Sequence, residues 1–162
     1  MFSGPNKVVE VADDFPIGMW TTPEVGYYGM TKQAAIKAGF DAEEGIAQYD
    51  KCLRGRVFAP DGMLKLVFDR ESKRILGVHI IGTDACELVH YGMDLVEKQA
   101  TIFDVIGTLF TAVTFHELFK EAGATRVSSS LFLSLRTPDP VCVVVCRVPR
   151  LWTGSESKRQ HA

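Results

Sequence analysis

The chain has 162 residues, of which 46% are hydrophobic and 23% charged, and its formal net charge is −2. A chain of this length fits one globular domain with a buried core. The near-neutral charge argues against nucleic acid or an anionic membrane surface as partner, no apolar run is long enough to span a bilayer, and no secretory signal is visible. We therefore expect a cytoplasmic protein whose four cysteines are free thiols.

Charge divides the chain into two unlike parts. Residues 1–122 carry 12 basic and 18 acidic side chains, whereas residues 123–162 carry 6 basic and 2 acidic ones. The second part holds six of the eight serines and has no helical pattern of apolar residues. We place a boundary near Gly123 and expect the segment 123–162 to be disordered.

The first elements in chain order are short. Aromatic and β-branched residues broken by proline and glycine predict two short strands within 16–30, "PIGMWTTPEVGYYGM". A helix follows over 31–39, with Thr31 as its N-terminal cap and Gly39 as its C-terminal cap. The alternation in "EGIAQYDKCL", residues 44–53, then predicts a strand.

The clearest unit is an antiparallel hairpin over 62–82, "GMLKLVFDRESKRILGVHIIG", for which we expect one buried face. A helix is predicted over 84–98, where Asp84 and Glu87 form a capping-box pattern. Gly92 in its middle indicates close packing against another helix. Two short helices follow around a loop at 111–114.

Strands followed by helices in this order predict an α+β fold with a mainly antiparallel sheet and flanking helices. The sequence contains neither a G-x-G-x-x-G turn nor a P-loop motif. A nucleotide-binding function for this chain is therefore not predicted.

Four segments in unbroken order resemble one known family: "WTTPEVGYYGMTKQAA", the hairpin at 62–82, "ELVHYGMDLVE" and "TAVTFHELFKEA". They are similar to the C-terminal dimerisation domain of the FAD-dependent pyridine nucleotide-disulfide oxidoreductases, and within that family most similar to the soluble pyridine nucleotide transhydrogenase branch. The resemblance implies a dimerisation domain at 13–122, a linker remnant at 1–12 and an unrelated segment at 123–162. It also implies FAD and NAD(P) as cofactors of the full-length protein, with none expected for this chain alone.

The resemblance directs attention to the loop before the last helix. Disulfide-reducing members of the family carry His-Pro-Thr-x-x-Glu there, and the histidine is the acid-base group for the partner subunit's redox disulfide. In this sequence Ala112 takes the histidine position and Val113 the proline position, whereas Thr114 and Glu117 match. The resemblance therefore implies no catalytic residue in this chain. It implies that Ala112, Val113 and Thr114 lie near the partner's FAD in a full-length dimer.

We interpret most of the remaining histidines and charged residues as structural or solvent-exposed rather than catalytic. We interpret His90 and His116 as surface or interface residues, and Glu117 as a solvated or capping carboxylate. His79 is either a pH-sensitive contact or, as we favour, an ordinary strand residue. The basic residues of the hairpin are interpreted as a solvated face. Cys142 and Cys146 are a weak pattern for a metal site, because zinc needs four ligands, and a metal- or redox-sensing segment that uses this pair stays a third alternative.

Two functions from different classes are consistent with these observations. In the first, the chain is a fragment of an FAD-dependent NAD(P)+ transhydrogenase-like oxidoreductase and is inactive by itself. In the second, it is a stand-alone, non-catalytic module for self-association or interaction. The expected partner is a second copy or a full-length paralogue.

Overall fold

A five-stranded antiparallel sheet forms the centre of the computed structural model, which describes residues 15–125. The strands are β1 (Ile17–Met19), β2 (Val25–Gly29), β3 (Ala42–Gln48), β4 (Gly62–Asp69) and β5 (Ile75–Gly82). Their order across the sheet is β1-β2-β5-β4-β3, so β4 and β5 lie in its interior and β1 and β3 at its edges. This confirms the predicted α+β fold with an antiparallel sheet.

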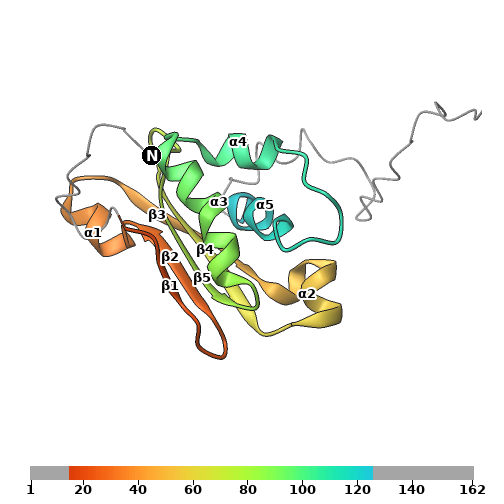
Figure 1. Ribbon diagram of the computed structural model, residues 1–162. Coiled ribbons are helices and arrows are strands. Elements are labelled where there is room, and N and C mark those ends of the chain that lie inside the picture. Colours follow the sequence, from red (N-terminus) through yellow and green to blue (C-terminus); the bar gives the residue numbers. More distant parts are fainter. Residues whose placement is uncertain (1–14, 126–162) are drawn as a thin grey trace, which may run out of the picture.

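Within residues 15–125, six helical segments surround the sheet (Figure 1). They are α1 (Lys32–Lys37), the 3-10 turn η2 (Tyr49–Lys51), α2 (Leu53–Phe58), α3 (Ala85–Glu97), α4 (Ile102–Gly107) and α5 (Glu117–Ala124). Helix α3 packs on β2 and β5, and α5 packs on β3 and β4, so that these two helices cover one face. The main core lies between this helical layer and the sheet.

Helix α1 confirms the predicted caps. The hydroxyl of Thr31 accepts a hydrogen bond from the amide of Ala34 at 3.2 Å. Gly39 adopts a φ of +93°, which a residue without Cβ tolerates best. Ala35 then packs against the opposite face of the sheet in a second, smaller core with Ala42, Val67 and Leu76.

The hairpin is confirmed, but its burial differs from the expectation of one buried face. Leu64 and Leu66 point to the main core, whereas Val67 and Leu76 lie in the second core under α1. A register irregularity between Val67 and Phe68 accompanies this change. Both faces of the hairpin are therefore buried at its α1 end.

The strand predicted over 44–53 was wrong in its second half. Strand β3 ends at Gln48, and the chain then turns into η2 and α2. The ring of Tyr49 is fully buried, and its hydroxyl donates to the carbonyl of Thr83 at 2.9 Å. The sulfur of Cys52 accepts from the amide of Gly55 at 3.3 Å and caps α2. These contacts turn the chain away from the sheet, although the residues alternate as in a strand.

Two details of α3 also correct the sequence interpretation. Asp84 adopts a left-handed conformation with φ 60° and makes no side-chain cap, so the capping box with Glu87 is not formed. The carboxylate of Glu24 instead accepts from the amide of Cys86 at 3.1 Å. Gly92 does not meet another helix: a Cβ there would lie 2.5 Å from a methyl group of Val78 on β5.

The segments 1–14 and 126–162 lie outside the described residues, and with them the expected disorder of 123–162 beyond Thr125 and the pair Cys142 and Cys146. The described cysteines, Cys52 and Cys86, are free thiols, as predicted for this pair.

Candidate functional site

The loop between α4 and α5 is held by hydrogen bonds at several points. The carboxylate of Glu117 accepts from the backbone amides of Val113 at 3.1 Å and Thr114 at 3.3 Å. The hydroxyl of Thr114 donates to the carbonyl of Thr111 at 2.8 Å. The ammonium group of Lys120 donates to the carbonyl of Thr108 at 3.2 Å. The loop is therefore an ordered structure in spite of its exposure.

Ala112 and Val113 lie at the exposed tip of this loop, and Thr114 is half-buried behind them. Val113 has a φ of 63°, which is unfavourable for a β-branched residue. Because neither side chain at the tip carries an ionisable group, this tip transfers no proton. Glu117 serves as the acceptor that closes the loop, in line with its interpretation as a capping carboxylate.

His116 belongs to an aromatic cluster. Its ring centroid lies 5.6 Å from that of Tyr91, 6.2 Å from that of Phe110 and 6.1 Å from that of Phe119. These contacts join the start of α5 to α3 and to the loop after α4. His116 is therefore a packing residue in this structure, and His90 is exposed on α3.

A cavity of about 340 Å³ opens beside the loop. Its lining comes from three elements that are distant in sequence: Arg54, Asp84, Glu87, Leu88, Phe115 and His116. The guanidinium of Arg54 lies 5.3 Å from the ring centroid of Phe115 and 5.6 Å from that of Phe58. The sequence did not indicate this cavity, because the predicted strand ended at residue 53 and no element was predicted for the segment that carries Arg54.

His79 lies in the middle of the other face of the sheet. Its ring stacks on Tyr27 with centroids 6.0 Å apart, and neither ring nitrogen has a hydrogen-bond partner among residues 15–125. Burial, and secondly the charge of Lys65 on the adjacent strand, lower the pKa of His79 to about 4. The imidazole is therefore neutral at pH 7.

The basic residues of the hairpin do not converge on an anion site. Lys65 forms an ion pair with Glu44 at 3.0 Å, and Arg70 forms one with Glu43. Lys65 and Arg70 are thus each matched by a carboxylate of β3, whereas Nε of Arg74 is buried and has no hydrogen-bond partner among residues 15–125. The interpretation as a solvated face holds for the exposed Arg70 and was wrong for Lys65, Lys73 and Arg74, which are half-buried.

The two described thiols are not activated. Burial raises the pKa of Cys52, and burial followed by the nearby Glu24 raises that of Cys86. Within the described part of the chain, no group of three or more histidine, cysteine or acidic residues is arranged to hold a metal ion. No described helix is long and apolar enough to cross a membrane.

The loop does not fit a flavin as a proton-transfer or phosphate-binding site. The amides of Val113 and Thr114 are already bonded to Glu117, so they do not form an anion-binding turn. What the tip offers to a planar ring is apolar contact through Ala112 and Val113.

Comparisons with known proteins agree with this fold. Residues 15–123 match the family model for the pyridine nucleotide-disulphide oxidoreductase dimerisation domain. The soluble pyridine nucleotide transhydrogenase of Mycobacterium bovis is 37% identical over 108 residues, which are 66% of this chain and 23% of that protein. The protein of the same name from Vibrio cholerae is 34% identical over 116 residues, or 69% of this chain and 25% of that protein.

Solved structures show the same fold. LpdA from Mycobacterium tuberculosis superposes with a TM-score of 0.64 at 17% identity, covering 68% of this chain and 24% of that one. The HOCl-induced flavoprotein disulfide reductase RclA from Escherichia coli gives 0.65 at 21% identity, covering 72% and 27%. The chain spans about a quarter of the length of the curated relatives it matches. By its matched domain, the chain belongs to the pyridine nucleotide-disulphide oxidoreductase family, whose dimerisation domain it carries.

Proposed function

We propose that this chain serves as the homodimerising domain of an FAD-dependent NAD(P)+ transhydrogenase-like oxidoreductase in the cytoplasm. The proposed domain covers 13–122, with a linker at 1–12 and a separate segment at 123–162. The observation that carries the proposal is the loop at 111–114, whose tip has no acid-base group. Such a loop suits hydride exchange between nucleotides, which requires no disulfide, better than it suits disulfide reduction.

The identity to transhydrogenases over this domain supports the same assignment. The full-length proteins of the family depend on FAD and NAD(P). In this proposal the partner's FAD supplies electron transfer between the two nicotinamides. The ordered surface beside the FAD would be formed by Ala112, Val113 and Thr114. The hydrogen bonds that Glu117 accepts hold this surface in place.

In this proposal residues 1–162 alone are inactive, because they contain no dinucleotide-binding turn. The test is to replace the matching domain of the Mycobacterium bovis transhydrogenase with residues 15–123. We expect an FAD-loaded dimer that transfers hydride from NADPH to an NAD+ analogue. We also expect residues 1–162 alone to show no turnover.

A chimaera that is monomeric or loses FAD would contradict the proposal. Turnover by residues 1–162 alone would contradict the expected inactivity. The alternative function, a stand-alone interaction module, predicts a different transcript. Its open reading frame would start at Met1 and encode no dinucleotide-binding turn. Long-read sequencing of that transcript distinguishes the two.

A further inference from the structure

The cavity beside the loop at 111–114 combines an apolar floor with a charged rim. Leu88 and Phe115 line it and are only 3% and 4% exposed, so they form the floor. Arg54, Asp84 and Glu87 line it as exposed residues at the rim. Its volume of about 340 Å³ lies within the range of small-molecule sites, which is about 300–1,000 Å³. The size and the mixed lining suit a small polar molecule that also has an apolar part.

The basic side of the rim comes from α2. This helix has an apolar surface, since Leu53, Val57 and Phe58 are exposed. The guanidinium of Arg54 lies 5.6 Å from the ring centroid of Phe58 and 5.3 Å from that of Phe115. These contacts hold the cation at the cavity, and its N–H groups have no hydrogen-bond partner in the described part of the chain.

The acidic side of the rim comes from the start of α3. Asp84 precedes this helix and Glu87 lies in its first turn. Neither carboxylate accepts a hydrogen bond or forms an ion pair within residues 15–125. Their two negative charges outweigh the helix N-terminus, which is equivalent to roughly half a positive charge. Figure 1 shows the start of α3 and α2 at the same end of the molecule as the connection between α4 and α5.

Unpaired charges of both signs define the class of ligand. An anion would meet the two carboxylates and a cation would meet Arg54, whereas a molecule with an ammonium and a carboxylate group can bond to both sides. We propose that this cavity binds a zwitterionic α-amino acid with an apolar side chain. The ligand carboxylate then accepts from Arg54, its ammonium donates to Asp84 and Glu87, and its side chain lies on the apolar floor. The inference goes beyond the proposed function, which assigns no ligand to this cavity.

The first test varies the ligand and uses L-phenylalanine as the probe. Binding to the full 162-residue chain is measured by isothermal titration calorimetry and by shifts of backbone amide resonances. We expect a dissociation constant of about 1 mM or below, with shifts at Glu87 and His116. L-Phenylalaninamide lacks the carboxylate, 3-phenylpropanoate lacks the ammonium and L-alanine lacks the ring. Each should bind about tenfold or more weakly than L-phenylalanine.

The second test varies the protein. Arg54→Met keeps an apolar chain beside the aromatic rings and removes the charge, so L-phenylalanine should bind this variant no better than its amide does. Asp84→Asn combined with Glu87→Gln removes both negative charges, so L-phenylalanine should bind this variant no better than 3-phenylpropanoate does. Asparagine suits position 84 because it tolerates the left-handed backbone there.

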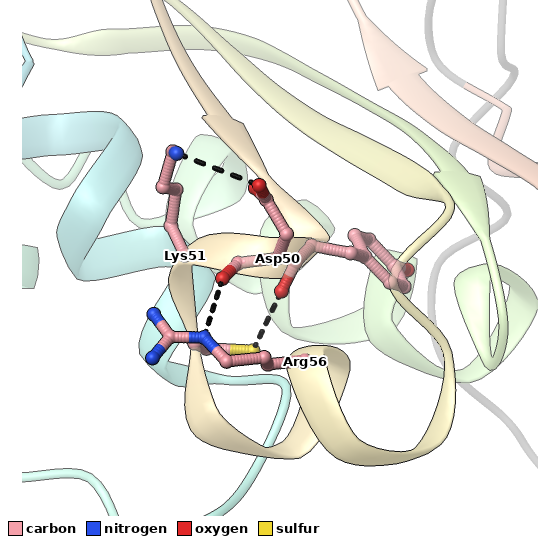
Figure 2. A network of polar contacts seen from close by, with 5 residues as sticks. Asp50, Lys51 and Arg56 are labelled. Carbon is pink, nitrogen blue, oxygen red and sulfur yellow. Dashed lines mark hydrogen bonds and ion pairs between the residues drawn. The ribbon is translucent and has the colours of Figure 1, made fainter.

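Arg56→Met is the matched control, because Arg56 lies on the same helix but does not line the cavity. Figure 2 shows Arg56 beside Asp50, to whose carbonyl its Nε donates at 3.3 Å, while Lys51 forms an exposed ion pair with the Asp50 carboxylate at 3.5 Å. Arg56→Met should leave L-phenylalanine binding unchanged. Circular dichroism establishes that each variant is folded.

Three results would overturn this site. They are no binding of L-phenylalanine up to about 10 mM, equal binding of L-phenylalanine, its amide and 3-phenylpropanoate, and equal effects of Arg54→Met and Arg56→Met. Sedimentation equilibrium on the same samples measures dimerisation separately. A failure of the ligand site therefore leaves the proposed function intact, and a monomeric chain that binds L-phenylalanine leaves the ligand site intact.

Discussion

The carboxylate of Glu117 accepts a hydrogen bond from the backbone amide of Val113, 3.1 Å away, and thereby closes the loop before α5. Glu117→Ala leaves the amides of Val113 and Thr114 without this acceptor. We expect a loss of about 1–2 kcal/mol in the free energy of unfolding, and faster hydrogen exchange at these two amides. Glu117→Gln keeps one acceptor oxygen, so its free energy of unfolding should lie between those of the wild type and Glu117→Ala. Glu121→Gln, an exposed change on the same helix, is the control. Unchanged exchange at both amides in Glu117→Ala would contradict this role.

The backbone of Val113 is the least favourable in the loop for its side chain. A left-handed conformation costs an L-residue about 1–2 kcal/mol, and glycine avoids this cost while losing roughly 0.5–1 kcal/mol of chain entropy. Val113→Gly should therefore raise the free energy of unfolding slightly, by about 0.5–1 kcal/mol. Thermal and urea unfolding measure this. Leu109→Gly is the control. Leu109 is also exposed but has no positive φ, so this change should lower the free energy of unfolding.

Gly92 allows α3 to lie directly on β5. Gly92→Ala brings a methyl group to 2.5 Å from Val78, which is fully buried. Overpacking costs about 1–3 kcal/mol and exceeds the gain in helix propensity of about 1 kcal/mol. We expect a net loss of about 1–2 kcal/mol in urea unfolding.

Two further variants test this explanation of Gly92. The double variant Gly92→Ala with Val78→Ala should lose less free energy of unfolding than the two single variants together, because the Val78 side chain causes the clash. Gly107→Ala is the matched control, since a Cβ there meets nothing within 4 Å and stability should not fall.

His79 should make the stability of the fold depend on pH. Its folded pKa of about 4 lies below the ordinary value of 6.5, so the unfolded chain binds the proton more readily between these values. The stabilising contribution is complete above about pH 6.5 and is lost as pH falls toward 4. The shift sets an upper bound of roughly 3 kcal/mol, which solvent screening reduces.

The measurement is urea unfolding at pH 7 and pH 4.5 at one protein concentration. Wild type should lose more stability between these values than His79→Leu, which has no imidazole to protonate. Equal losses would show that other groups account for the pH dependence in this range.

Several elements followed from local sequence because local contacts determine them. The cap of α1 needs only Thr31 and the amide three residues later, and the hairpin needs only two apolar strands and the polar turn between them. The resemblance to the family's dimerisation domain pointed to four positions in and after the loop: Ala112, Val113, Thr114 and Glu117. These predictions rest on spacings of a few residues.

The sequence by itself determined the fold class, the family and the absence of a histidine at position 112. Only the tertiary structure decided where the chain leaves the sheet after Gln48 and what caps α3. Tyr49 turns inward to reach Thr83, and Glu24 reaches the start of α3 from a distant loop. The cavity beside Arg54 and the apolar surface of α2 follow from the same turn. Such contacts join residues distant along the chain, and their energies outweigh a local alternation that by itself favours a strand.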